Sequence, residues 1–162
     1  MLKVGLGSII YEPIVMINND NHSIIIGNNC RIGQFSIIAP RRLVMEDGAE
    51  VSNLVVLGGG GNIRLGKYSA IGAGAKLIPA TFTTQGEYMN DVIPEKSELI
   101  RGSISIGEGA YIGSGAIIYI SKKCPHIVIG DHAVVGALTY IDKSIPSNMI
   151  VHTKHELEMY LK

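Results

Sequence analysis

The segment that decides the fold runs from residue 106 to residue 118 and reads Ile-Gly-Glu-Gly-Ala-Tyr-Ile-Gly-Ser-Gly-Ala-Ile-Ile. An aliphatic residue followed by Gly stands at its start and again six residues later, and a third aliphatic residue follows after six more. An amphipathic helix repeats at about 3.6 residues and an alternating strand at about 2, so neither produces a sustained period of six. A coil in which every sixth side chain points into a shared interior does produce it.

The same repeat recurs along most of the 162 residues. Further aliphatic-Gly pairs six residues apart are Ile26-Gly27 and Ile32-Gly33, Leu65-Gly66 and Ile71-Gly72, and Ile129-Gly130 and Val135-Gly136. The registers continue without Gly through Ile38, Val44, Leu77 and Ile141. Each unit of six is then one short strand and one corner, and three units close a triangular turn. Residues about 18 apart, such as Ile26 and Val44, should stack on successive coils, and the repeat predicts about seven coils.

The composition agrees with short strands joined by tight turns. The chain has 26 Ile and 20 Gly but no Trp and only 2 Phe, so aliphatic residues must fill its core. A hydrophobic content of 46% excludes intrinsic disorder, and the length indicates one domain. The 14 basic and 14 acidic residues cancel, so the chain has no net field to attract nucleic acid or an anionic membrane.

The cysteines and the apolar segments indicate in which cellular compartment the chain is expected. Cys30 and Cys124 are too few and too far apart for a disulfide framework or a Cys-x-x-Cys site, so we expect two buried thiols in a reducing cytoplasm. The apolar stretch near the N-terminus is cut by Glu12 and Pro13, with no cleavage site for a leader after it. These features predict a cytoplasmic location without membrane insertion.

Two interruptions break the repeat. From Pro79 to Gly102 the period disappears over a polar stretch, which predicts a loop extruded from the coil at about residues 79–103. Ile118 and Ile129 are 11 residues apart, which predicts a shorter bulge around residues 121–124.

The repeat ends after Pro146. Thr153-Lys-His-Glu156 reads as a capping box, so we predict a short C-terminal helix over residues 153–162 that covers the last coil. The predicted organisation is therefore a β-helix domain over residues 1–152 followed by that helix.

Four segments in the second half, taken in order, resemble a known family. They are Gln85-Gly-Glu-Tyr-Met-Asn-Asp-Val-Ile-Pro94, Ile106-Gly-Glu-Gly-Ala-Tyr-Ile-Gly-Ser-Gly115, Ile129-Gly-Asp-His-Ala-Val-Val-Gly-Ala137 and Asp142-Lys-Ser-Ile-Pro146. They resemble the hexapeptide-repeat acyltransferases, and among these the acetyltransferases of surface-polysaccharide and modified-sugar pathways. The resemblance covers residues 65–146 well and the first 64 residues only through the repeat. It implies an all-β fold, a left-handed parallel β-helix, and a homotrimer with active sites between neighbouring subunits.

The resemblance also implies acetyl-CoA as co-substrate, with its pantetheine arm along the outside of the C-terminal coils. By motif match, Ser114 and Ala137 correspond to positions that line this arm, and Lys143 to a basic position near the nucleotide phosphates. The corners themselves require small residues, so the repeat alone also accounts for Ser114 and Ala137. Lys122 and Lys123 on the bulge either contact phosphate or are simply solvated.

The family's usual histidine near the start of the extruded loop is absent, because no histidine lies between His22 and His126. One explanation is that the acceptor is an amine, which in its neutral form needs far less help with proton removal than a hydroxyl does. The other is that a different group accepts the proton. Asp91 and Glu87 are the first candidates for binding the acceptor and accepting its proton, since burial can raise the pKa of a carboxyl group toward neutrality. Tyr88 and Asn90 beside them are expected to bind the acceptor.

His126 or His132 of a neighbouring subunit is the next candidate for the base, and His126 is preferred because it follows the bulge and could project toward the cleft. His132 lies six residues further on, so the two should occupy adjacent faces and cannot pair on a metal ion. No metal site is expected.

These features predict transfer of acetyl from acetyl-CoA to a hydroxyl or amine of a sugar or nucleotide-linked sugar. The acceptor attacks the thioester directly, without a covalent enzyme intermediate, so the protein supplies positioning and proton removal. The alternative is a structural trimer that has kept the fold and lost the chemistry. The identity of the acceptor, the acyl length and the choice between oxygen and nitrogen are left open.

Overall fold

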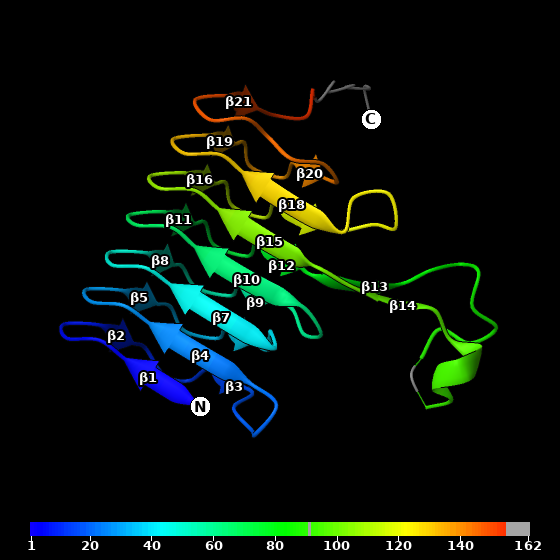
Figure 1. Ribbon diagram of the computed structural model, residues 1–162. Coiled ribbons are helices and arrows are strands. Elements are labelled where there is room, and N and C mark those ends of the chain that lie inside the picture. Colours follow the sequence, from blue (N-terminus) through cyan, green and yellow to red (C-terminus); the bar gives the residue numbers. More distant parts are fainter. Residues whose placement is uncertain (91, 155–162) are drawn as a thin grey trace, which may run out of the picture.

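The chain folds into a prism of stacked turns, shown from the side in Figure 1. The computed structural model describes residues 1–90 and 92–154. Each turn adds one strand to each of three parallel sheets, and the sheets form the three faces of the prism. The architecture is a left-handed parallel β-helix, which confirms the predicted fold class.

The strands of each sheet follow one another in sequence order. Sheet A contains β1 (Leu2–Val4), β4 (Ser23–Ile26), β7 (Arg42–Met45), β10 (Asn62–Leu65), β15 (Ser103–Ile106) and β18 (His126–Ile129). Sheet B contains β2 (Ile9–Ile10), β5 (Arg31–Ile32), β8 (Glu50–Val51), β11 (Ala70–Ile71), β16 (Tyr111–Ile112), β19 (Val134–Val135) and β21 (Ile150–Val151). Sheet C contains β3 (Val15–Met16), β6 (Ile37–Ile38), β9 (Val56–Leu57), β12 (Lys76–Ile78), β17 (Ile117–Tyr119) and β20 (Tyr140–Ile141). The described residues thus make six complete turns and part of a seventh, where about seven were predicted.

The interior is filled by columns of aliphatic side chains. On sheet A, one column consists of Ile26, Met45, Leu65, Ile106 and Ile129, which occupy paired positions on successive strands and are all buried. Neighbouring strands are about 4.8 Å apart, so these side chains touch from turn to turn. Each fully buried aliphatic side chain contributes about 1.5–3 kcal/mol relative to leaving it exposed.

The predicted stacking of Ile26 with Val44 is wrong. Ile26 pairs with Met45, and Val44 pairs with Ile25 on the outer surface of the sheet. The corner at residues 39–41 contains one residue more than the ideal repeat, so the inward position shifts by one. Because strand side chains alternate between faces, this shift exchanges the inner and outer residue.

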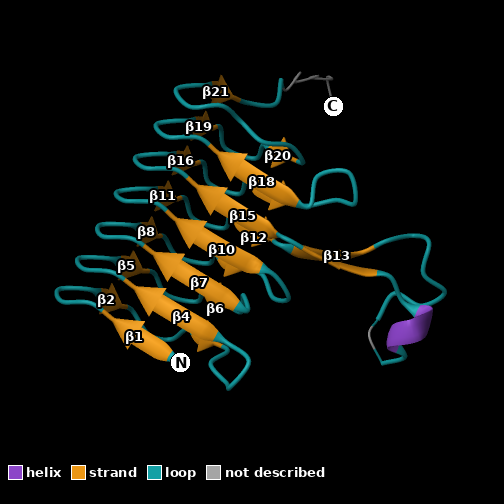
Figure 2. Cartoon of the chain, in the orientation of Figure 1, coloured by secondary structure: helices purple, strands orange, loops and turns teal. Residues whose placement is uncertain are grey.

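The long insertions share one edge of the prism, where sheet C passes to sheet A, and we call it the loop edge (Figure 2). Within the described ranges, the insertions at this edge are residues 17–22, 39–41, 58–61, 79–102 and 120–125. The other two edges, between sheets A and B and between sheets B and C, are closed by short turns. Extra chain is therefore accommodated without disturbing the stacking of the coils.

The longest insertion is the extruded loop, residues 79–102. It leaves the coil as an antiparallel pair of strands, β13 (Ala80–Phe82) and β14 (Leu99–Arg101), and carries the 3-10 helix η1 (Pro94–Lys96) near its tip. The sequence placed its end at about residue 103, but Ser103 already belongs to β15. At the root, a Cβ on Gly102 would lie 1.8 Å from the Pro125 carbonyl oxygen, so only glycine allows this close approach to the next turn.

The coil extends to Val151 at the end of β21. The predicted C-terminal helix over residues 153–162 lies, from residue 155 on, outside the described residues, and it stays a prediction together with the division at residue 152. Across the described ranges, the structure has no helix with the length and apolar character needed to cross a membrane.

The three outer faces differ in polarity. The outward side chains of sheet C are mostly apolar, namely Val15, Ile37, Val56, Ile117 and Tyr140, interrupted by Lys76. Sheet A is polar next to the loop edge, where the outward residues are Ser23, Arg42, Asn62, Ser103 and His126. Sheet B is mixed, with Ile9, Arg31, Glu50, Ala70, Tyr111, Val134 and Ile150. Sheet C is thus the most apolar face.

Bulky apolar residues also stand at several turns in the left-handed backbone region. Phe35, Leu54 and Leu138 on the edge between sheets B and C have φ of 58°, 62° and 56° and are 61%, 60% and 70% exposed. A left-handed conformation costs a residue with a side chain about 1 kcal/mol or more. The repeat predicted small or flexible residues at these corners, so these three positions depart from that prediction.

Candidate active site at the loop edge

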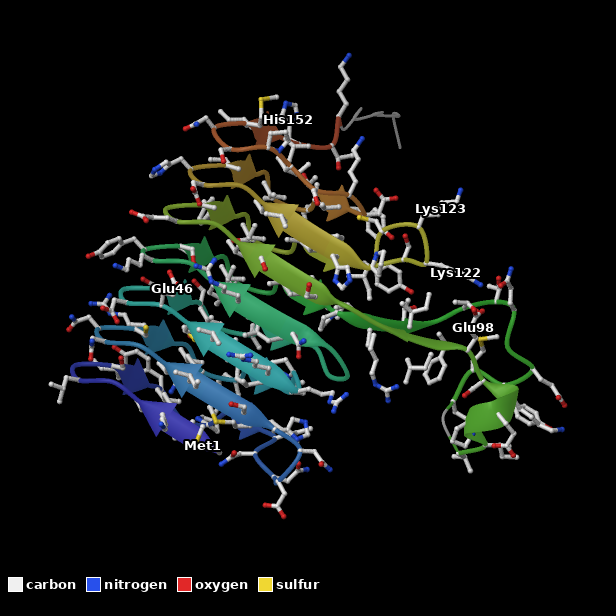
Figure 3. All side chains as sticks on the ribbon, viewed as in Figure 1. Met1, Glu46, Glu98, Lys122, Lys123 and His152 are labelled. Carbon is white, nitrogen blue, oxygen red and sulfur yellow. The ribbon has the colours of Figure 1, made fainter. Side chains whose placement is uncertain are left out.

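The extruded loop is fastened to the coil by the neighbouring bulge. The ammonium group of Lys122 lies 2.7 Å from Gln85 Oε1 and 2.7 Å from Glu98 Oε1, both in the extruded loop. Lys122 and Glu98 lie near one another in Figure 3. The Thr83 hydroxyl donates to the other carboxylate oxygen of Glu98. The Glu98 carboxylate therefore connects Lys122 to both arms of the extruded loop, the one that follows β13 and the one that precedes β14.

The pKa of the Glu98 carboxyl is held below its usual value of 4.5 by the hydrogen bond from Lys122 first and by the one from Thr83 second. The group is therefore charged at neutral pH, and the link to Lys122 is formed there. A group with a lowered folded pKa stabilises the folded form above its unfolded pKa, and this stabilisation is lost as the pH falls through the lowered value.

We expect Lys122→Ala to loosen the extruded loop without unfolding the coil. Amide hydrogen exchange in residues 83–98 should become a few-fold faster at neutral pH, and wild-type protein should show the same change only when acid protonates Glu98. The matched control is Lys123→Ala, since Lys123 is a neighbouring exposed lysine with no hydrogen-bond partner in the described part of the chain. Equal effects of the two substitutions would contradict the role given to Lys122.

His126 lies at the same edge, immediately after the bulge. It begins β18, is exposed, and pairs with Ser103, the first residue of β15. Its Nδ1 is 3.0 Å from the Ser103 Oγ. When Nδ1 carries the proton and donates it to this hydroxyl, Nε2 is free to accept a proton from a substrate. Ser103 can therefore orient the ring of His126.

The tip of the extruded loop holds the other predicted acceptor residues. Glu87 forms an ion pair of 3.2 Å with Lys96, whose ammonium also lies 5.3 Å from the centre of the Tyr88 ring. Tyr88 and Asn90 line a cavity of about 250 Å³ with Val92 and Ile93. Asp91 lies outside the described residues.

Within one subunit, the tip stands well away from the prism (Figure 1). A single subunit therefore does not bring Glu87, Tyr88 and Asn90 together with His126.

The predicted cofactor residues lie on two different edges. Ser114 and Ala137 are exposed on successive turns of the edge between sheets B and C, after β16 and β19. Ala73 takes the equivalent place one turn earlier, and the adjacent Gly74 has no heavy atom within 4 Å of where its Cβ would be. Residues 72–75 and 113–116 of this edge thus carry only small side chains, so a ligand can reach their backbone, whereas the turn at residues 136–139 also presents the exposed Leu138.

Lys143, by contrast, follows β20 on the loop edge and is exposed. The next residue, Ser144, accepts a hydrogen bond of 3.0 Å from the backbone N–H of Val128 in β18. Within one subunit, Lys143 therefore lies on a different edge of the prism from Ser114 and Ala137.

Two residues of this site were not identified from the sequence. The sequence assigned no role to Ser103, and it left open whether Lys122 contacts phosphate or is simply solvated. Counting the repeat backward from Ile106 would have placed Ser103 outward and next to His126, because Ile104 and Ile127 occupy the same column. No sequence signal links Lys122 to Gln85 and Glu98, which are 37 and 24 residues away.

Curated proteins that are similar to this chain in sequence include a GlmU protein and a WcaF protein. No family model matches the chain. The bifunctional protein GlmU of Heliobacterium modesticaldum is 25% identical over 187 residues, covering 96% of this chain and 39% of GlmU. WcaF of Escherichia coli strain K12, provisionally named as a colanic acid biosynthesis acetyltransferase, is 31% identical over 97 residues, covering 54% of this chain and 52% of WcaF. The chain thus spans about half or less of the length of these curated relatives.

Solved structures share the fold. AntD, an N-acyltransferase from Bacillus cereus in complex with dTDP and 3-hydroxybutyryl-CoA, has a TM-score of 0.80 at 24% identity, covering 93% of this chain and 77% of AntD. PerB from Caulobacter crescentus, in complex with CoA and GDP-perosamine, has a TM-score of 0.55 at 18% identity, covering 91% of this chain and 55% of PerB. By the order of its motifs and by its fold, the chain is similar to the hexapeptide-repeat acyltransferases.

Proposed function

We propose that this protein transfers an acyl group, specifically acetyl, from its CoA thioester to an amino or hydroxyl group of a nucleotide-linked sugar. The observation that carries the proposal is the difference between the two edges of sheet C: one has only small side chains at residues 72–75 and 113–116, and the other bears the extruded loop and His126. AntD and PerB, which share the fold, bind CoA compounds together with nucleotides or nucleotide sugars, and this supports the same substrate classes here. Cys30 and Cys124 are both free thiols, which fits a cytoplasmic location, although only Cys30 is buried as expected and Cys124 is half-buried.

The protein acts as a homotrimer in which sheet C faces the threefold axis. Sheet C is the most apolar face, and Ile37 and Tyr140 on it are 39% and 55% exposed in one subunit. Phe35, Leu54 and Leu138 extend this apolar surface along the adjoining edge. Burying these side chains against a second and third copy removes them from water, which is the main driving force for stable association.

This arrangement completes the site. A prism that turns one face to a threefold axis brings the two edges of that face against its two neighbours. The edges of sheet C are the loop edge and the edge between sheets B and C, so the loop edge of one subunit meets the other edge of the next. Ser114 and Ala137 would then lie opposite His126 and Lys143 of a neighbouring subunit, with CoA between them.

In the reaction, the acceptor nitrogen or oxygen forms a bond to the thioester carbonyl carbon. The C–S bond then breaks and CoA leaves as its thiolate, which the proton taken up by His126 converts to the thiol. His126 accepts the proton of the acceptor, while Glu87, Tyr88 and Asn90 on the extruded loop hold the sugar, together with Asp91. The protein contributes mainly by holding the two substrates in contact.

The direct test is isothermal titration of the purified chain with acetyl-CoA, followed by single-turnover transfer to a nucleotide-linked amino sugar and to its hydroxyl analogue. We expect saturable binding with one site per subunit, and acetyl transfer to at least one acceptor. A protein that fails to bind acetyl-CoA would instead be the structural trimer without chemistry.

A further inference from the structure

The outer face of sheet A contains a groove that lies outside the inferred subunit interface. The groove has a volume of about 310 Å³ and is lined mainly by Arg42, Val44, Asn62, Arg64, Ser103 and Ser105. All six project outward from β7, β10 and β15, while the residues between them are buried. The polar groups of three turns therefore open onto one depression.

The depression arises from a change in side-chain size between turns. Ser103 and Ser105 on β15 lie beside Asn62 and Arg64 on β10, which in turn lie beside Arg42 and Val44 on β7. Neighbouring strands are about 4.8 Å apart, so the groove spans about 10 Å from β7 to β15. On the β15 side the two small serines leave room, and their hydroxyl groups line the groove there.

The charge of the groove is positive. Arg64 is held across the strands by Glu46, with 2.5 Å between its guanidinium nitrogen and the carboxylate oxygen. Arg42 has no carboxylate partner in the described part of the chain. The donors that face the groove are thus two guanidinium groups, one of them uncompensated, together with two hydroxyls and the amide of Asn62.

We propose that this groove binds a phosphate or diphosphate group of a phosphorylated substrate. Guanidinium groups bind phosphate oxygens with paired, charge-assisted hydrogen bonds, and serine hydroxyls and the Asn62 amide add neutral donors. Arg64 is fixed by Glu46, so it loses little side-chain freedom on binding.

The position of the groove fits a substrate that reaches from the proposed cleft. Ser103 lies in both places, because it lines the groove and hydrogen-bonds His126 at the loop edge. Gly102, the last residue of the extruded loop, precedes it directly. A sugar held at the loop edge would therefore place an attached diphosphate on the outer face of sheet A. This assignment rests on the proposed acyl transfer, and it adds that one of the substrates is bound at this groove through a phosphate or diphosphate group.

The test measures binding rather than turnover. We expect inorganic pyrophosphate to bind the wild-type chain in calorimetry, and to bind more weakly at high salt. Arg42→Ala should weaken this binding about tenfold or more, as expected for loss of a charge-assisted hydrogen bond. Ser105→Leu, which fills the β15 side of the groove, should abolish it. The matched control is Arg31→Ala, which removes an exposed arginine from β5 on sheet B and should leave the affinity unchanged.

Two further titrations identify the source of the phosphate. A nucleoside diphosphate and CoA are each titrated into wild type and Arg42→Ala. Loss confined to the nucleoside diphosphate assigns the groove to the acceptor, and loss confined to CoA assigns it to the donor. Absence of pyrophosphate binding, or equal weakening by Arg31→Ala, would overturn the proposal. Pyrophosphate binding without acyl transfer would overturn the proposed function and leave the phosphate site standing.

Discussion

Replacing Ile37 by Glu is expected to convert the trimer into monomers and to abolish acyl transfer. Ile37 lies on the outer surface of β6 in sheet C and is 39% exposed in an isolated subunit. In the inferred trimer it is buried, so each subunit would bury an unpaired carboxylate. An uncompensated buried charge costs about 3–5 kcal/mol, and three copies meet in one assembly. The two edges that make up the cleft would then separate.

The measurement is sedimentation at micromolar concentration, with single-turnover transfer assayed on the same samples. Wild type should sediment as three chains and Ile37→Glu as one chain of 17.4 kDa. The matched control is Ile25→Glu, because Ile25 also projects outward from the same turn but lies on sheet A. This control should remain trimeric and active. A wild-type monomer, or a trimer that survives Ile37→Glu, would show that sheet C does not form the interface.

The coil was predictable from the sequence because one residue in six determines it. Ile106, Ile112 and Ile118 each fill the interior at consecutive faces, and all three are buried. Val44 shows where this reasoning fails, since one extra residue at a corner reverses which side chain points inward. Corner insertions cost little free energy, so their length is not constrained by the repeat.

The site was predictable only in part, because it depends on contacts between residues distant in sequence. The motifs led to Ser114, Ala137 and Lys143, but they did not show that these residues occupy two edges. Only the polarity of the three faces suggests how the edges meet. That polarity follows from the alternation of inward and outward residues once the register is known.

The second large effect is expected at His126. Removing a general base typically lowers the rate by about 10²–10⁴-fold, so His126→Ala should reduce transfer to a hydroxyl acceptor by this amount. The loss should be smaller for an amine acceptor assayed where the amine is neutral, because a neutral amine attacks without prior proton removal. The affinity for acetyl-CoA should not change.

Ser103→Ala separates positioning from proton transfer. Ser103 does not take the proton itself, so its loss should lower transfer less than loss of His126 does. Glu87→Ala and Asp91→Ala serve as comparisons, since residues that only hold the sugar should weaken acceptor binding more than they slow the chemical step. If His126→Ala keeps the wild-type rate on both acceptors at every pH, His126 is not the base. A carboxylate of the extruded loop would then have to accept the proton.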